Sequence, residues 1–396
     1  MMKRPQVVGG KITTVAVPLD GALAHSDGLD SGFGVRNVVE LETDAGLVGL
    51  GEVGPRVKHE ELVIAARELV GLDIFDVQAL HARLRSEKFY QMSLAMVEAT
   101  FEMALLDVQG KYAGVRVADL LGGVVRGQVP MIGYVYRKEQ TEYGERVQST
   151  DEVVEHVRRL VTRYGFRTVK VKAGVAAPMS EVETVRALRE AFPEVELRVD
   201  PNGAWSVPTA LNVCRELEGA RLEWLEDPVL TRRGMGEVAR RVAIPLATNM
   251  CCIQPLEFPD TICAKAIDVL LVDLWYTGGL RQAKQMAAMC RTFGVDVGIH
   301  AGGGACELGI GLAAELQVAA SLPSLVHAAD AEYHHLSDDI IKGGLLGYSG
   351  GCLALPEGPG LGVNIDQDRL GKYADLYQLH VAQARPAGSF PAYPIW

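Results

Sequence analysis

The amino-acid sequence predicts an α/β protein in which an N-terminal α+β region precedes a closed β/α barrel. Two patterns along the 396 residues predict this fold class. Roughly the first 125 residues combine a strand–turn–strand pattern with helical periodicity, and from about Thr168 short β-rich runs alternate with helix signals. Such alternation is typical of parallel strands joined by helices, and the number of units favours a closed barrel over an open sheet.

The N-terminal region contains a predicted β-hairpin and two predicted helices. Residues 38–43 alternate toward a turn at residues 44–46, and residues 47–53 continue the alternation, after a Gly-rich polar loop at residues 25–34. Apolar residues recur with helical spacing from Glu60 to about Val70 and from Leu94 to Tyr112. In the second helix, the acidic residues fall mostly outside the apolar face; they are Glu98, Glu102 and Asp107.

The barrel region contains seven β-rich runs separated by helix signals. Ser206 can cap a helix with Pro208 in its first turn, and Gly279 and Gly294 bracket another helix. The runs are Thr168–Val171, Val195–Val199, Leu222–Leu225, Pro245–Thr248, Asp268–Val272, Asp296–Ile299 and Leu325–Ala328.

A polar residue follows each of the first six runs at nearly constant spacing. Successive members lie 23 to 28 residues apart, about the length of one β/α unit. Because the C-terminal ends of all barrel strands face one mouth, we expect these side chains to converge there in an active site. The six residues are Lys172, Asp200, Glu226, Asn249, Asp273 and His300.

Three of these residues offer oxygen ligands from consecutive strands. Asp200, Glu226 and Asn249 include no Cys or His, which favours Mg²⁺ over Zn²⁺, so we expect one Mg²⁺ per active site. The alternative is that residues 200–203 form only a turn and that residues 226–228 cap a helix. The common register favours the metal site, and Asp227 would point away from Glu226 at a strand end.

Two lysines and a histidine predict acid–base chemistry at the same mouth. Lys170 and Lys172 share one face of a strand, so each ammonium group would disfavour protonation of the other, and Lys172 could act as a base. His300 lies across the barrel, where Asp273 could hold its ring and set the tautomer. The alternatives are two lysines exposed on an edge strand and a histidine that is hydrogen-bonded within the core.

The composition excludes other classes of function. With 39 Lys and Arg against 50 Asp and Glu, the net charge is −11 and no dense basic cluster occurs, so we expect no nucleic-acid binding. We find no apolar signal-peptide core at the N-terminus and no stretch of membrane-spanning length, which predicts a cytoplasmic protein without a membrane partner. The seven scattered cysteines lack a CxxC pattern and argue against a disulfide framework.

Several stretches resemble the mandelate racemase and muconate lactonizing branch of the enolase superfamily, and most of all the glucarate dehydratases. Asn249 as the third ligand is typical of the glucarate dehydratases, and the resemblance covers nearly the whole chain. The stretches are residues 170–172, 199–205, 224–228, 247–250 and 298–300, with C-terminal likeness at residues 342–344 and 356–362.

This resemblance implies a modified TIM (β/α)7β barrel with an α+β N-terminal capping domain completed by the C-terminal tail. The capping domain would comprise residues 1–130 with the tail 365–396, and the catalytic barrel residues 131–364. The implied chemistry is abstraction of the proton α to a carboxylate, with Mg²⁺ stabilising the enediolate, as is general in this superfamily.

The resemblance also implies roles for individual residues. Lys172 and His300 would take the proton from opposite faces of the substrate, and Lys170 would bind the carboxylate and tune Lys172. Asn202 resembles a donor on the oxyanion side, and Glu332 resembles an acid or a substrate-binding group. The alternative for Glu332 is that it is only an exposed carboxylate in a loop. We also assign His25 and Tyr134 to substrate binding.

We therefore expect a Mg²⁺-dependent lyase that dehydrates an acid sugar to a 2-keto-3-deoxy acid. Its substrate would be a small carboxylate, and we expect the protein to form a homo-oligomer. The alternatives are a racemase or epimerase of a 2-hydroxy acid, a muconate-type cycloisomerase, and a barrel that binds a metal and a ligand without turnover. The particular acid stays open, because the chain departs from the glucarate dehydratases where the distal end of the substrate is recognised. The departures are Ala301 and Gly302, the longer loop at residues 25–33, residues 88–91, and Glu332 in place of a His.

Overall fold

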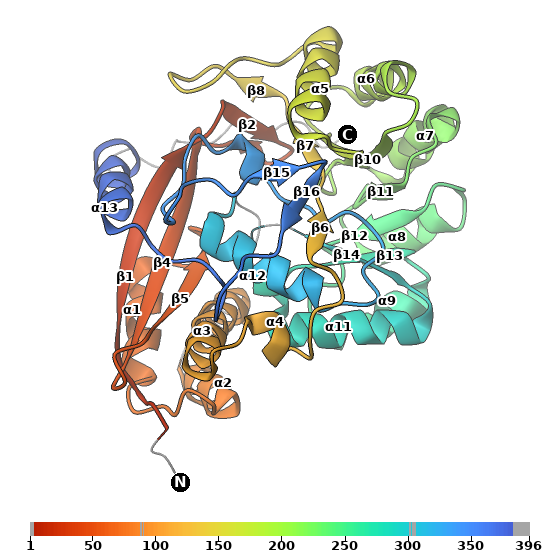
Figure 1. The fold of residues 1–396 in the computed structure, drawn as a ribbon. Helices are drawn as coiled ribbons and strands as arrows, with labels where there is room; N and C mark the ends of the chain where they lie inside the picture. The colour runs from red at the N-terminus through yellow and green to blue at the C-terminus, as the bar shows by residue number, and fades with distance from the viewer. Residues whose placement is uncertain (1–3, 88, 90, 301, 303–305, 383–396) are drawn as a thin grey trace.

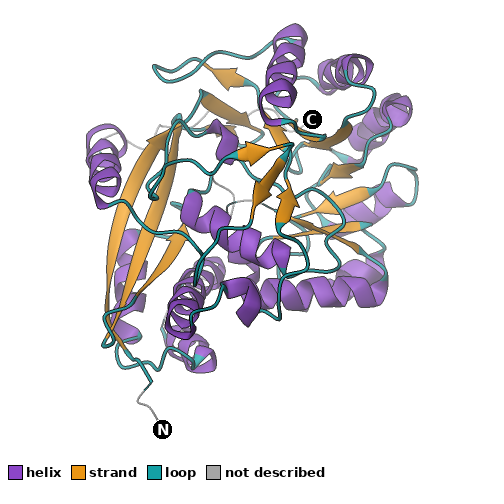
Figure 2. Ribbon diagram, viewed as in Figure 1, coloured by secondary structure: helices purple, strands orange, loops and turns teal. Residues whose placement is uncertain are grey.

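The computed structural model describes residues 4–87, 89, 91–300, 302 and 306–382 (Figure 1). Ala301, Lys88, Tyr90 and the tail from residue 383, to which some of the expectations above refer, lie outside the described residues. Within the described part, a strand-rich N-terminal layer lies beside a curled parallel sheet surrounded by helices (Figure 2). The α/β class with a capping region is thereby confirmed.

The N-terminal layer is an antiparallel sheet of β1 (Val7–Pro18), β4 (Phe33–Thr43) and β5 (Val48–Val53), in the order β1–β4–β5. The predicted hairpin is confirmed as β4 and β5, which pair from Asn37–Val53 to Glu42–Val48. Helices α1 (His59–Glu68), α2 (Val77–Ser86) and α3 (Gln91–Ala113) follow. The C-terminal α13 (Gln367–Leu376) packs against β1, and a short π-helical segment (Tyr377–Val381) continues it. The exact domain boundaries stay predictions.

Helix α3 lies directly on β5, and two glycines permit this approach. A Cβ at Gly49 would lie 2.0 Å from the Ala104 carbonyl oxygen, and one at Gly51 would lie 2.4 Å from that of Thr100. The expectation that the acidic residues of α3 lie outside its buried face is wrong, because partners surround the helix. Arg85 pairs with Glu98, the Arg281 N–H donates to Glu102, and the Leu50 and Leu361 N–H groups donate to Asp107.

The expected Gly-rich loop at residues 25–34 is partly ordered into strands. β2 (Ala22–His25) and β3 (Gly28–Leu29) form a hairpin, and β8 (Lys138–Glu139) adds to β2. The Asp30 carboxylate accepts hydrogen bonds from the Leu23 and Gly32 N–H groups, which holds the end of this hairpin. The hairpin carries His25 toward the barrel mouth.

The barrel sheet contains seven parallel strands in the order β14-β13-β12-β11-β10-β9-β7. The first six predicted runs are confirmed as strands, and β7, which has only three residues, was not among the predicted runs. The strands are β7 (Gly133–Val135), β9 (Thr168–Lys172), β10 (Glu196–Asp200), β11 (Trp224–Glu226), β12 (Leu246–Thr248), β13 (Val269–Val272) and β14 (Asp296–Ile299).

The seventh predicted run, Leu325–Ala328, is not a regular strand. Single bridges, Leu325 to Val297 and Ala329 to Met131, join this segment to both edges of the sheet. Guanidinium groups bind two of its carbonyl oxygens: Arg126 donates to Leu325 and Arg198 to Ala328. The segment thus closes the ring without forming a strand.

Helices cover the outside of the barrel sheet (Figure 1). The two predicted helices are confirmed as α7 with Ser206 as its N-cap, and as α11 between Gly279 and Gly294. Among the described helices, none combines the length and apolarity needed to cross a bilayer. The helices are α4 (Val117–Leu120), α5 (Thr150–Tyr164), α6 (Pro178–Ala191), α7 (Val207–Leu217), α8 (Arg232–Ala239), α9 (Phe258–Ala264), α10 (Leu274–Thr277), α11 (Leu280–Phe293) and α12 (Gly309–Ala320). Two short strands, β15 (Tyr348–Ser349) and β16 (Cys352–Ala354), pair with β6 (Gln128–Pro130).

Glu52 at the end of β5 joins the N-terminal layer to the barrel. Its carboxylate pairs with Arg36 at 2.7 Å and accepts hydrogen bonds from the N–H groups of Leu308 and Gly311, at the start of α12. The Trp275 indole N–H donates to the Glu52 carbonyl at 2.6 Å. Because Glu52 and Arg36 are fully buried and paired, losing either partner would leave an unpaired charge inside the protein.

Candidate active site

A cavity of about 550 Å³ lies at the C-terminal ends of the barrel strands. Cap residues from the β2–β3 hairpin and Arg56 form part of its wall. Six of the sequence-predicted residues line it; they are His25, Lys172, Asn202, Asn249, His300 and Glu332. Four others, Lys170, Asp200, Glu226 and Asp273, are buried at the same strand ends, and Tyr134 is considered below.

The expected metal ligands contain two buried oxygen atoms without a hydrogen-bond partner in the described chain, Glu226 Oε1 and Asn249 Oδ1. Asp200 accepts hydrogen bonds from Lys172 and from the Asn202 N–H. Burial, together with the nearby Asp200 charge, raises the pKa of Glu226 to about 8. Unpaired oxygens and accumulated negative charge at one point are what a cation site requires.

We did not expect Asp227 to be a metal ligand. In the structure it positions an expected ligand, Asn249. Its Oδ2 accepts the Asn249 backbone N–H at 2.9 Å, and Oδ1 accepts the Thr248 hydroxyl. Asp227 has φ of 36°, a conformation that side-chain-bearing residues adopt infrequently. The carboxylate therefore fixes the end of β12, from which Asn249 reaches the cavity.

The two lysines are paired with carboxylates. Lys170 Nζ donates to Glu226 Oε2 at 2.8 Å and also to Asp330, and Lys172 Nζ donates to Asp200 and to Asn202 Oδ1. The expectation that the lysines hold each other less protonated is wrong for Lys170. Burial alone lowers its pKa, but Asp330 and Glu226 together raise it above the ordinary value, so Lys170 is a fixed positive charge.

Tyr134 lies beneath these lysines and not in the cavity. Its ring centroid is 4.6 Å from Lys170 Nζ and 5.5 Å from Lys172 Nζ, a cation–π arrangement. The ring is fully buried and is absent from the cavity lining, so the expectation of direct substrate contact is not met. Tyr134 comes from β7, and the parallel pairing of β7 with β9 places it beside Lys170.

His300 and Asp273 adjoin the cavity on its β13–β14 side. His300 Nδ1 lies 2.8 Å from Asp273 Oδ2, and the ring stacks on Tyr276 at a centroid distance of 6.2 Å. Strands β9 and β14 are separated by four intervening strands in the sheet order. Lys172 and His300 therefore approach the cavity from different sides of the three oxygen ligands.

Glu332 and His25 line the cavity, and both contact Tyr136. The Tyr136 hydroxyl donates to Glu332 Oε1 at 2.6 Å, and the His25 ring meets Tyr136 edge-on at 5.1 Å. Glu332 is buried, which excludes the alternative of an exposed loop carboxylate.

Sequence reasoning missed Arg56, Tyr276 and Asp330. Arg56 lines the cavity from the N-terminal layer and donates to the Tyr276 hydroxyl at 3.3 Å, and no strand-end register marks it. Asp330 binds both Lys170 and Arg198. It lies two residues after the seventh run, whose strand-end position is Ala329, so the strand-end register does not mark it.

The donor set fits Mg²⁺. Asp200, Glu226 and Asn249 offer carboxylate and amide oxygens, which this hard cation prefers, and two of those oxygens are buried without a partner in the described chain. The ammonium groups of Lys170 and Lys172 pair with Glu226 and Asp200. Asp200, Glu226 and Asn249 would hold the ion.

Family models match most of the chain. Residues 35–122 match the mandelate racemase / muconate lactonizing enzyme N-terminal domain, and residues 152–369 match an enolase C-terminal domain-like model. A probable glucarate dehydratase of Streptomyces coelicolor is 38% identical, covering 93% of this chain and 91% of its own length. A D-galactonate dehydratase of Xanthomonas euvesicatoria is 30% identical, covering 84% and 89%.

A solved structure extends the similarity to the whole fold. An enolase from Thermobispora bispora, crystallised with magnesium and formate, has a TM-score of 0.88 and 37% identity, covering 94% of this chain and 93% of its own. Both domain models, the relatives and the fold indicate the same superfamily. The chain belongs to the enolase superfamily of enzymes, in its mandelate racemase and muconate lactonizing enzyme branch.

Proposed function

We propose that this enzyme is a Mg²⁺-dependent acid-sugar dehydratase, which removes the proton α to a carboxylate and expels the β-hydroxyl as water. One observation carries the proposal: Lys172 and His300 line a single cavity from different sides of three oxygen ligands. Two relatives with dehydratase names support it.

The proton to be removed is weakly acidic, because its loss places a second negative charge beside a carboxylate. Bound Mg²⁺ would supply the positive charge that stabilises this enediolate. Lys170 adds a second fixed charge, since Asp330 and Glu226 hold it as an ammonium group. Such preorganised charges act most strongly where water is excluded, and Lys170 is fully buried.

Lys172 is the proposed base. Its amine is ion-paired with Asp200, and a cation held by that carboxylate would weaken the pair. Asn202 binds Lys172 Nζ at 2.9 Å and so aims it. His300, whose Nδ1 faces Asp273, presents its other ring nitrogen for proton transfer to the leaving hydroxyl.

The substrate we propose is a diacid such as glucarate. Arg56 and Lys172 are the Arg and Lys side chains among the described residues of the cavity wall. Lys172 belongs to the metal end, which leaves Arg56 at the N-terminal layer to pair with a distal carboxylate. A monoacid such as galactonate would leave Arg56 without an anionic partner.

The test is incubation with a library of acid sugars in D₂O and Mg²⁺, followed by proton NMR. A 2-keto-3-deoxy product confirms a dehydratase, whereas an inverted hydroxy acid with deuterium at the α-carbon identifies an epimerase. A lactone formed from an unsaturated diacid identifies a cycloisomerase. Lys172→Ala and His300→Asn then separate the two steps, and absence of exchange for every acid overturns the proposal.

A further inference from the structure

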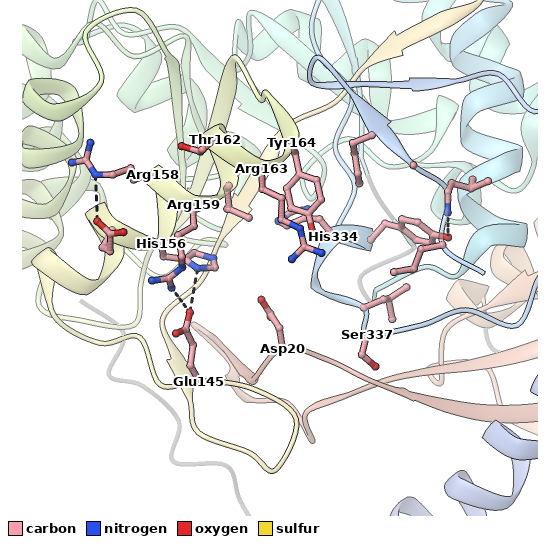
Figure 3. Close-up of a pocket in the computed structure, with 18 residues that line it drawn as sticks. Asp20, Glu145, His156, Arg158, Arg159, Thr162, Arg163, Tyr164, His334 and Ser337 are labelled. Carbon is pink, nitrogen blue, oxygen red and sulfur yellow. Dashed lines mark hydrogen bonds and ion pairs between the residues drawn. The ribbon is translucent and has the colours of Figure 1, made fainter. Parts of the chain in front are cut away.

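A second cavity, of about 960 Å³, lies between helix α5 and residues 333–348 (Figure 3). Among the residues that the structure describes, it shares no lining residue with the cavity at the strand ends. Figure 3 shows His156 on α5 and Asp20, just after β1, both directed toward this space. The proposed dehydration uses neither residue.

Asp20, His156 and His335 gather at one point beside this cavity. One oxygen or nitrogen atom from each lies within 4.8 Å of those of the other two. Asp20 Oδ1 is 2.9 Å from His335 Nδ1, and the two imidazole rings stack with an interplanar angle of 9°. Three segments distant in the sequence supply these side chains.

The histidines retain unused nitrogen atoms. Both ring nitrogens of His156 and Nε2 of His335 are buried without a hydrogen-bond partner in the described chain. The nearest carboxylate oxygen recorded for His156, Glu145 Oε1, is 3.8 Å from Nδ1, beyond hydrogen-bond distance. Buried polar atoms of this kind normally have a partner, so unpartnered nitrogen atoms on two of these three clustered side chains point to a ligand here.

We propose that Asp20, His156 and His335 form a second metal site, for a divalent transition ion such as Zn²⁺. Two imidazoles and one carboxylate suit this class of ion, whereas Mg²⁺ prefers the oxygen set at the strand ends. Ligand atoms of a tetrahedral zinc site lie about 3.3 Å apart, so small side-chain movements would complete the site. The adjoining cavity gives the ion a path and leaves room for water as the fourth ligand.

The ammonium group of Lys138 opposes a cation at this site, so the proposal predicts an effect of replacing Lys138. Its buried ammonium group donates to Asp20 Oδ2 at 2.9 Å. Replacing it with a neutral side chain of similar length should strengthen metal binding, whereas a site elsewhere would be indifferent. Bound metal would also tie α5 and the end of β1 to His335, three residues after Glu332.

The test is titration of chelator-treated, tag-free full-length protein with Zn²⁺ by calorimetry, in excess Mg²⁺ that occupies the strand-end site. We expect one Zn²⁺ per chain and a thermal midpoint raised by several degrees. His156→Asn and His335→Asn should each weaken binding at least tenfold, and Lys138→Met should tighten it severalfold. Co²⁺ should give the visible absorption of a low-coordinate nitrogen–oxygen site in the unmodified protein.

Two controls locate the ion. His81→Asn, in the N-terminal layer, should leave the affinity unchanged, and Asp200→Asn should leave the zinc count unchanged while removing the Mg²⁺ site. Circular dichroism establishes that each variant is folded. The proposal is overturned if no Zn²⁺ binds in excess Mg²⁺, if His156→Asn and His335→Asn bind like the parent, or if Asp200→Asn abolishes binding.

Discussion

Asp273 divides its carboxylate between two tasks: Oδ2 lies 2.8 Å from His300 Nδ1, while Oδ1 accepts the N–H groups of Trp275 and Tyr276. The first contact orients the proposed acid, and the second caps helix α10. The two tasks use different oxygen atoms, so one substitution can separate them.

Asp273→Asn should lower kcat by about 100-fold or more, because the amide can still cap α10 through its oxygen but offers His300 an N–H in place of an acceptor. The measurement is steady-state turnover together with α-deuterium exchange in D₂O. Exchange through Lys172 should persist while dehydration falls. If both fall equally with unchanged thermal stability, His300 is not the separate acid.

Asp227→Ala should weaken Mg²⁺ binding by about 10- to 100-fold, since partners of ligand-bearing segments typically matter to this extent. Asp227 holds the Asn249 backbone N–H at 2.9 Å. Activity at saturating Mg²⁺ should recover toward the parent value, which a merely misfolded variant would not do.

Asp268→Ala is the matched control, because Asp268, just before β13, holds the other end of β12. Its carboxylate accepts the Leu246 N–H at 2.9 Å, at the opposite end of β12. We expect lower thermal stability and unchanged Mg²⁺ affinity, and equal Mg²⁺ effects in the two variants would contradict a positioning role for Asp227.

Arg56→Ala should raise KM for a diacid about five- to tenfold with little change in kcat, as for an ion pair near solvent. A monoacid should be affected much less. The measurement is KM for glucarate and for galactonate in both proteins, with Arg56→Lys expected between them. An equal change in KM for both acids would show that Arg56 does not bind the distal carboxylate.

Asp30→Asn should stabilise the protein increasingly as pH rises. Burial raises the pKa of Asp30 from 3.8 to about 7, so the folded state holds this proton more tightly than the unfolded state. The free energy of unfolding is therefore reduced as pH rises through that interval, and the reduction is complete above it. Asn keeps the acceptor oxygen for Leu23 and Gly32 without ionising.

Thermal midpoints at several pH values test this. The difference between Asp30→Asn and the parent should grow between about pH 4 and pH 7 and then level. Asp27→Asn, at an exposed position of the same hairpin, should show no such trend. A constant difference at all pH values would exclude the ionisation of Asp30 as the cause.

The order of strands and the end at which the polar residues lie could be predicted from the sequence. Parallel strands joined by helices repeat at an almost constant length, and residues two apart on a strand share a face. These local rules place Lys172, Asp200, Glu226 and His300 at one end of the sheet, as the structure does. They also located the β4–β5 hairpin and both bracketed helices.

The closure of the ring and the buried charges could not be predicted in this way. Guanidinium groups from distant segments bind the carbonyls of residues 325 and 328, and the acids of α3 find partners on β5 and elsewhere. Neither partner is near in sequence. From helical periodicity alone, an acidic residue of α3 outside the apolar face is therefore expected to face solvent.

By itself, the sequence determined the architecture, the register of the strand-end residues and the chemical type of the ligand set, because strand and helix periodicities are local. Only the tertiary structure decided what surrounds those residues. It paired Lys170 with Asp330, placed Tyr134 beneath the lysines and brought Arg56 from another layer into the cavity. These relationships depend on long-range packing, in which burial and neighbouring charge set the protonation of each group.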